Sequence, residues 1–292
     1  MRLSCVVGGL VLLMAAGCDR NAVARSASAP APEAPAAAAA TGLQPFSVPS
    51  ADGPLWGYRD AAGQVVVPPR FASAGAFREG RARVWFAPAP RDAEAASGDL
   101  AGWGFLAPTG EWAIPPRYLA AGEFAGGEAP VLLEGDRYAI VGPDGRILRE
   151  PGARADAAGR PPLPSADCRT LTAYVEELAP LGDELALLAS PHEGEATRRL
   201  SVRFLPGGAR LLVIGGWEGA RREVRLPGVS MEEGRRILRR FSADHATRDV
   251  TAEHPGHALA LEFVGEGGFA ETLFLRALPE GGIEIGGDIA YG

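Results

Sequence analysis

The sequence predicts an α+β protein in which a β-rich module of stacked hairpins precedes an α+β domain with an antiparallel sheet and two helices. Two observations support this fold class. The stretches "LWGYRDAAGQVVVPPRF" at 55–71 and "GWGFLAPTGEWAIPPRY" at 102–118 repeat one pattern. The second half instead shows short alternating runs between glycine-rich turns, and two segments with helical spacing. With 292 residues, 47% of them hydrophobic, the chain is long enough for both parts.

The N-terminal segment 1–17 has the pattern of a signal peptide. Arg2 precedes an apolar run that is too short to span a bilayer comfortably, and the run ends in "AAGC" at 15–18. This end resembles the bacterial lipobox, although Ala15 stands where Leu is usual. The resemblance implies cleavage between Gly17 and Cys18, and acylation of Cys18 by diacylglycerol and a palmitate-type chain. The alternatives are an ordinary secretory signal or an uncleaved anchor, with Cys18 incidental.

Residues 18–50 are rich in Ala, Pro and Ser and predict a disordered tether between the anchor and the folded protein. Cys5 would leave with the signal peptide and Cys18 would be acylated, so only Cys168 remains and no intramolecular disulfide is expected. The predicted location is the cell envelope, facing the periplasm or the cell surface. Asp19 resembles an inner-membrane retention signal of enterobacterial lipoproteins, but the choice between inner and outer membrane stays open.

The repeated pattern recurs at an offset of 47 residues, which aligns Trp56 with Trp103 and the two Pro-Pro-Arg motifs with each other. A degraded third copy follows at an offset of 35, with Tyr138 in the place of Trp103 and Gly145 as the turn glycine. The difference between the two offsets places an insertion in the first copy, at 87–98, where we expect an exposed loop. A repeat of about 35 residues predicts an array of stacked units over residues 51–151.

One unit consists of an aromatic-rich strand, a turn that ends in glycine, and a second strand. We expect Pro68-Pro69 and Pro115-Pro116 to end the hydrogen-bonded ladder, because proline has no N–H to donate. A single hairpin cannot bury its own apolar face. Neighbouring units are therefore expected to stack on one another.

The pattern resembles the WG-repeat (KWG) family over residues 52–151. The resemblance implies a β-rich repeat module that mediates interactions, and it brings no catalytic residues. Two interpretations of its aromatic side chains stay open: an exposed strip for a glycan or peptide, or the stacking core between repeats. We favour the core, because aromatic side chains that recur at one structural position usually pack on each other. The residues concerned are Trp56, Tyr58, Trp103 and Phe105.

Residues 152–165 predict a linker, and residues 166–292 predict the α+β domain. Leu171, Tyr174, Val175 and Leu178 share one face of a helix. Strands are expected at 200–204, 209–214, 222–226, 257–264, 271–278 and 282–291. A capping box at 230–233 begins the second helix.

Four arginines lie on this second helix: Arg235, Arg236, Arg239 and Arg240. They suit either a patch for anionic headgroups or a solvated face in which Glu232 pairs with Arg236. We favour the solvated face.

The chain offers few candidates for chemistry. His245, His254 and His257 are weak candidates for a metal site, because their spacing through a Pro-Gly turn is no helical metal motif. All 29 basic residues are Arg, which excludes Schiff-base lysine chemistry and the Walker lysine. A net charge of −7 with scattered arginines disfavours nucleic acid as a partner. No metal and no cofactor is expected.

Together these observations predict a lipid-anchored, non-catalytic binding or scaffolding protein of the cell envelope. Its partner would be an envelope protein or a cell-wall glycan. The alternative is an envelope hydrolase or a metal-dependent enzyme with a site in the C-terminal domain, around the three histidines.

Overall fold

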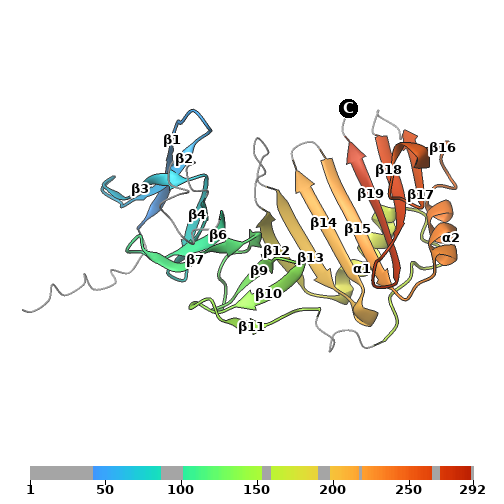
Figure 1. Cartoon of the computed structure of the whole chain (residues 1–292), viewed down its shortest axis with the longest axis horizontal. Helices are drawn as coiled ribbons and strands as arrows, with labels where there is room; N and C mark the ends of the chain where they lie inside the picture. Colours follow the sequence, from blue (N-terminus) through green and yellow to red (C-terminus); the bar gives the residue numbers. More distant parts are fainter. Residues whose placement is uncertain are drawn as a thin grey trace, which may run out of the picture. The chain divides into compact units, whose positions relative to one another are not determined.

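A computed structural model describes residues 42–86, 101–152, 159–189, 198–216, 219–264 and 270–290. These ranges form antiparallel sheets of three, four and twelve strands, together with two α-helices (Figure 1). The predicted α+β class, with a β-rich repeat region before an antiparallel sheet and two helices, is confirmed. Within the described ranges, no helix is long and apolar enough to cross a membrane.

The three copies form antiparallel units built on the same three-stranded core, to which β4 and β8 add a strand in the later copies. The first copy forms its own sheet from β1 (Gln44–Val48), β2 (Leu55–Arg59) and β3 (Val65–Phe71). The second forms β4 (Ser73–Arg78), β5 (Arg81–Phe86), β6 (Gly102–Leu106) and β7 (Trp112–Tyr118). The third forms β8 (Ala120–Ala121), β9 (Ala129–Leu133), β10 (Arg137–Val141) and β11 (Ile147–Arg149).

Strand β1 corrects the expected extent of the tether. Residues 44–48 fall in the segment that composition assigned to a disordered tether, yet they pair with β2 along its whole length. The reason is that the first copy needs a strand on the open side of β2, as β5 and β9 supply in the later copies. Residues 1–41, which include the predicted signal peptide, Cys18 and most of the tether, lie outside the described residues.

The turn of each copy has the same hydrogen bonds. The N–H of Gly63 donates to Asp60 at 3.0 Å, that of Gly110 to Ala107 at 2.9 Å, and that of Gly145 to Gly142 at 2.9 Å. All three glycines have positive φ angles between 77° and 83°, which a glycine adopts at little cost. The degraded third copy therefore keeps the turn geometry of the first two.

The Pro-Pro pairs do not end the ladder, contrary to expectation. Strand β3 continues through Pro68-Pro69, and its pairing with β2 passes from Tyr58–Val67 to Trp56–Phe71, four steps of β3 against two of β2. The prolines thus form a bulge, in which their missing N–H groups are not needed for pairing. The second copy repeats this shift between β6 and β7.

The bulge explains why glycine follows each tryptophan. A Cβ atom on Gly104 would lie 2.8 Å from the carbonyl oxygen of Ile114 and 2.9 Å from the nitrogen of Pro116. A Cβ atom on Gly57 would lie 2.7 Å from the nitrogen of Pro69. Only glycine permits the bulged backbone to approach so closely, so the Trp-Gly pair and the Pro-Pro pair are two halves of one feature.

The arginine after each Pro-Pro pair joins neighbouring copies. Arg117 donates from Nη2 to the carbonyl of Gly145 in the third copy at 2.7 Å, and Arg70 makes the matching bond to Gly110 in the second copy at 3.5 Å. The third copy has Gly152 at the matching position, where a side chain would collide with the Phe204 ring. The chain of arginine contacts therefore ends where the third copy meets the C-terminal domain.

The third copy shares one sheet with the C-terminal domain. The sheet order is β11-β10-β9-β8-β12-β13-β14-β15-β19-β18-β17-β16, with β8 paired to β12 through Ala120 and Ala121. The C-terminal strands are β12 (Glu184–Ala189), β13 (Arg199–Phe204), β14 (Arg210–Gly216), β15 (Gly219–Pro227), β16 (Thr247–Asp249), β17 (Leu259–Val264), β18 (Ala270–Ala277) and β19 (Gly282–Ala290). Strand β12 was not predicted, and its pairing makes the sheet continuous across the expected linker.

Two helices cover one face of the C-terminal strands, as Figure 1 shows. Helix α1 (Leu171–Leu178) buries Leu171, Tyr174 and Leu178, as its spacing predicts. Helix α2 (Met231–Phe241) begins at the predicted cap, where the Ser230 hydroxyl accepts from the N–H of Glu233. Short 3₁₀ turns occupy Ala179–Leu181, Pro206–Gly208 and Thr251–Glu253.

Two arginines of α2, Arg236 and Arg240, have partners of different kinds. Arg236 pairs with Glu233, three residues away, and not with Glu232 as predicted. Arg240 is half-buried and donates to the carbonyl of Pro164 at 3.4 Å. The Arg236 pair fits the solvated-face interpretation, whereas Arg240 departs from it and packs against the segment before α1.

Candidate functional site

A row of charged side chains crosses the sheet face opposite the helices. Strand register aligns Phe204, Arg210, Arg225, Glu284 and Arg276 as direct neighbours on β13, β14, β15, β19 and β18. Along these strands the charged residues alternate with apolar ones such as Val224 and Ile283, which pack under the helices. The alternation places one buried apolar layer on one face and a charged row on the other.

Glu284 is the buried centre of this row, with no exposed surface. Its Oε2 atom accepts hydrogen bonds from Arg225 Nε at 2.8 Å and from Arg276 Nη2 at 2.9 Å. Arg276 Nε forms an ion pair with the other carboxylate oxygen, Oε1, at 2.6 Å. Two cations thus compensate one buried anion, and charge-assisted hydrogen bonds of this kind are the strong ones.

Asp136, a residue of the third copy, pairs with two arginines of this row although its strands lie toward the other end of the strand order. Asp136 lies on the turn between β9 and β10, and its Oδ2 atom accepts from Arg210 and from Arg225, the latter at 2.6 Å. In the sheet order, β10 and β15 are six steps apart, about 29 Å along a flat sheet. The ion pairs therefore require the sheet to curl, so that the third copy reaches the C-terminal arginines.

The pKa of Asp136 reflects these partners. Burial alone would raise the pKa of the carboxyl, but hydrogen bonds and charges from Arg210 and Arg225 outweigh it and hold the pKa below its usual value. Tyr138, two residues later, lies under the Arg210 guanidinium at 5.3 Å and packs edge-on to Phe204 at 5.6 Å. Burial raises the pKa of Tyr138 to about 12, against the opposing Arg210 charge, so this hydroxyl stays protonated at neutral pH.

The lowered pKa of Asp136 predicts a pH-dependent contribution to stability. At pH 7 we expect the free energy of unfolding of the wild type to be about 1 kcal/mol higher than that of Asp136→Asn. The value is modest because the carboxylate is half exposed. A depressed folded-state pKa stabilises the fold fully above the unfolded pKa of about 3.9, and this stabilisation is lost as the pH falls through the lower folded value. Urea denaturation of both proteins between pH 7 and pH 3 measures the difference in their free energies of unfolding. This difference should become smaller only below about pH 4. A difference that does not change with pH contradicts this assignment.

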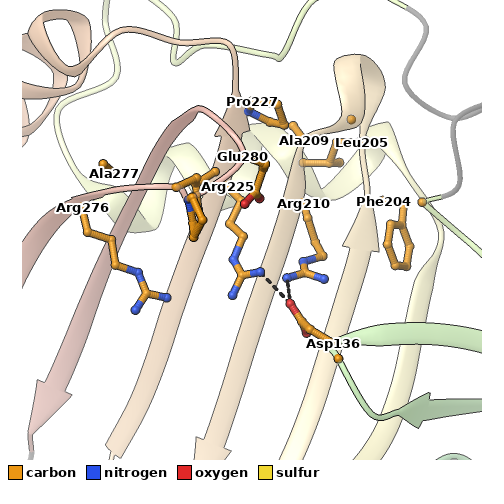
Figure 2. A pocket seen from close by; sticks show the side chains of 15 residues that line it. Asp136, Phe204, Leu205, Ala209, Arg210, Arg225, Pro227, Arg276, Ala277 and Glu280 are labelled. Atoms are coloured by element: carbon orange, nitrogen blue, oxygen red, sulfur yellow. Dashed lines mark hydrogen bonds and ion pairs between the residues drawn. The ribbon is translucent and has the colours of Figure 1, made fainter. Parts of the chain in front are cut away.

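The charged row forms one wall of a cavity of about 620 Å³ (Figure 2). Figure 2 shows Arg210 and Arg225 converging on Asp136, with Arg276 farther along the sheet, on β18, two strands from β15. Apolar side chains complete the wall. The lining residues are Gly135, Asp136, Gly152, Phe204, Leu205, Gly208, Ala209, Arg210, Arg225, Pro227, Arg276, Ala277, Leu278, Pro279 and Glu280. Three arginines and an apolar wall suit the binding of an anionic organic group.

The structure does not support the aromatic strip as a ligand surface. Tyr58, Trp103 and Phe105 have no exposed surface, and Trp56 is half-buried. Phe105 packs edge-on against Phe124, with ring centroids 4.9 Å apart, and Trp103 lies 5.8 Å from Trp85. These side chains form the cores of the repeats, as the favoured interpretation predicts, because each copy buries its apolar face only against neighbours.

The three histidines do not converge on one site. His245 is exposed and stacks on Phe263, with ring centroids 4.5 Å apart, whereas His257 packs on Phe274 at 4.9 Å. His254 and His257 adjoin each other with ring centroids 6.0 Å apart. Among the described residues, no group of three or more His, Cys, Asp or Glu side chains is placed to hold a metal ion.

Two other predictions concern Cys168 and the insertion at 87–98. Cys168 is buried beside helix α1, and burial raises the pKa of its thiol, which makes it a packing residue. The predicted insertion at 87–98 lies outside the described residues.

Neither the charged row nor Asp136 was predicted from the sequence. The alternation of Arg221, Glu223 and Arg225 with Val224 and Leu226 was available as an indication that β15 carries charge on one face. No local pattern, however, connects Asp136 with Arg225, which is 89 residues away.

Comparison with known proteins supports the repeat assignment. A family described as WG containing repeat matches residues 56–84 and 103–136. The second matched range ends at Asp136, so the repeat region extends to the cavity. No curated protein matches the chain.

Proposed function

We propose that this WG-repeat protein is a lipid-anchored, non-catalytic binding protein of the bacterial cell envelope. The lipobox-like end of segment 1–17 supports the anchor, with Cys18 as the acylated residue. The composition of residues 19–41 supports a tether that carries the folded part away from the membrane. An envelope protein or a cell-wall glycan would be the partner.

The observation that carries the binding role is the arginine-lined cavity. The aromatic side chains of the repeats are buried in their own cores, so the repeats serve as a scaffold. Their last copy contributes Asp136 to the cavity wall and Tyr138 beneath Arg210. A cavity of this size that combines apolar side chains with a few convergent polar groups is a usual form of a ligand site. The alternative of a hydrolase or metal enzyme gains no support from the separate packing of the histidines.

The anchor is tested on Cys18. In the wild type, mass spectrometry should find a mature N-terminus at an acylated Cys18, and the protein should fractionate with membranes. Cys18→Ala should abolish acylation and this processing. An unmodified mature N-terminus, or unchanged processing of Cys18→Ala, contradicts the proposal.

The binding role is tested with a photo-crosslinking amino acid at the cavity rim. Glu280 is exposed and lines the cavity, whereas Glu111 is an exposed residue of the second-copy turn and serves as the matched control. Irradiation of whole cells should give an adduct of defined mass from position 280 and not from position 111. Equal labelling at both positions, or none at position 280, contradicts binding at this cavity.

A further inference from the structure

We propose that the cavity binds an organic monocarboxylate, and that Asp136 is a built-in competitor which the ligand carboxylate displaces from Arg210 and Arg225. This inference rests on the proposed function, because it assumes that the cavity is the binding site. It adds the chemical class of the ligand and a residue that limits the affinity.

The geometry around Asp136 already shows a carboxylate bound by two guanidinium groups. Arg210 and Arg225 both donate to the same Oδ2 atom. A carboxylate offers about four acceptor positions on two oxygens, and each guanidinium carries five N–H donors. A ligand carboxylate that presents both oxygens would therefore use these donors more fully than Asp136 does.

The charge balance favours a single negative charge. Once Asp136 has turned toward solvent, which screens its charge, Glu284 is the one carboxylate among the described residues that stays bound to any of the three arginines, Arg210, Arg225 and Arg276, so two positive charges remain in the row. The exposed Glu280 at the rim reduces this excess to one. A monocarboxylate matches this excess, whereas a dianionic phosphate would meet repulsion from Glu280.

The apolar part of the cavity lining favours a ligand that carries an apolar group beside the carboxylate. The Phe204 ring lies next to Arg210 in the charged row, and Leu205 and Leu278 also line the cavity. Its volume of about 620 Å³ is larger than a bare carboxylate needs and suits a small organic molecule. The preferred ligand is thus a carboxylate with an apolar body, such as an N-acylated amino acid or the end of a peptide.

Asp136 is placed to move aside. Its side chain is 44% exposed, and it sits on a hairpin turn with a φ of 60°, in the left-handed region that aspartate adopts more readily than most residues. Gly135 before it also has a positive φ, of 71°. Displacement of this turn residue therefore disturbs little buried surface.

The test uses the full chain in detergent and isothermal titration with N-acetyl-L-phenylalanine. Asp136→Asn should bind this probe about tenfold more tightly than the wild type, a change of about 1.4 kcal/mol, because the internal competitor has lost its charge. Adding Arg210→Gln to that variant should reverse the gain. The matched control is Glu134→Gln, which removes one negative charge from an exposed position of the same turn and should leave the affinity unchanged.

Three outcomes overturn the inference: Asp136→Asn binds no more tightly than the wild type, Glu134→Gln gives the same gain, or the neutral amide N-acetyl-L-phenylalaninamide binds as well as the acid. Equal binding of N-acetyl-Ala-Ala-Phe identifies a peptide end as the source of the carboxylate, and weaker binding identifies a small molecule; both support the inference. If no variant binds the probe while crosslinking at position 280 succeeds, the carboxylate assignment fails and the binding function stands. If crosslinking also fails, both fail.

Discussion

Gly104→Ala is expected to lower the free energy of unfolding by about 3 kcal/mol, the upper end of the usual cost of overpacking. The new methyl group would meet the Ile114 carbonyl oxygen at 2.8 Å and the Pro116 nitrogen at 2.9 Å. These are backbone atoms of a bulge, and they cannot yield as the end of a flexible side chain does. Urea denaturation of the full chain, followed by tryptophan fluorescence and circular dichroism, measures the change.

Two positions of the same chain serve as controls for Gly104→Ala. Gly215 lies in β14, and a Cβ atom there would meet nothing within 4 Å, so Gly215→Ala should be neutral or slightly stabilising. The third copy already has Ala139 at the position of Gly104, fully buried, and its described strand ends at Arg149 before a Pro-Pro bulge can form. A small effect of Gly104→Ala would show that the bulge is not what requires glycine.

Glu284→Ala is expected to destabilise the protein by about 3 kcal/mol, because it leaves Arg225 and Arg276 facing each other without their shared anion. We expect the lower end of the range for a broken buried pair, since these two guanidinium side chains keep 25% and 36% of their exposure. The same denaturation experiment measures the change.

The matched control for Glu284→Ala is Glu150→Ala, which breaks the exposed pair between Glu150 and Arg137. The two side chains are 36% and 57% exposed, so its cost should stay below about 1 kcal/mol. A double variant that removes both Glu284 and Arg276 should cost less than the sum of the single changes. Equal costs for Glu284→Ala and Glu150→Ala would refute the central place of Glu284 in the charged row.

Local structure was predictable wherever the cause lies in neighbouring residues. The turn glycines Gly63, Gly110 and Gly145, the Ser230 cap and the apolar face of α1 all appear as predicted. Each depends on contacts within a short segment of chain. The expected end of the ladder at Pro68-Pro69 is wrong, because a missing N–H ends a strand only where the ladder needs a donor, and the structure places both prolines where it needs none.

By itself, the sequence determined the repeat, its turns, the two helices with most of the C-terminal strands, and the burial of the repeated aromatic side chains. These features depend on local spacing and on apolar periodicity, which one sequence displays directly. Only the tertiary structure decided that the third copy joins the C-terminal sheet and brings Asp136 to Arg210 and Arg225. The physical reason is that strand pairing between residues as distant in sequence as Ala121 and Leu188 depends on the packing of the whole sheet face. The curl of the sheet depends on the same packing, and no local pattern encodes it.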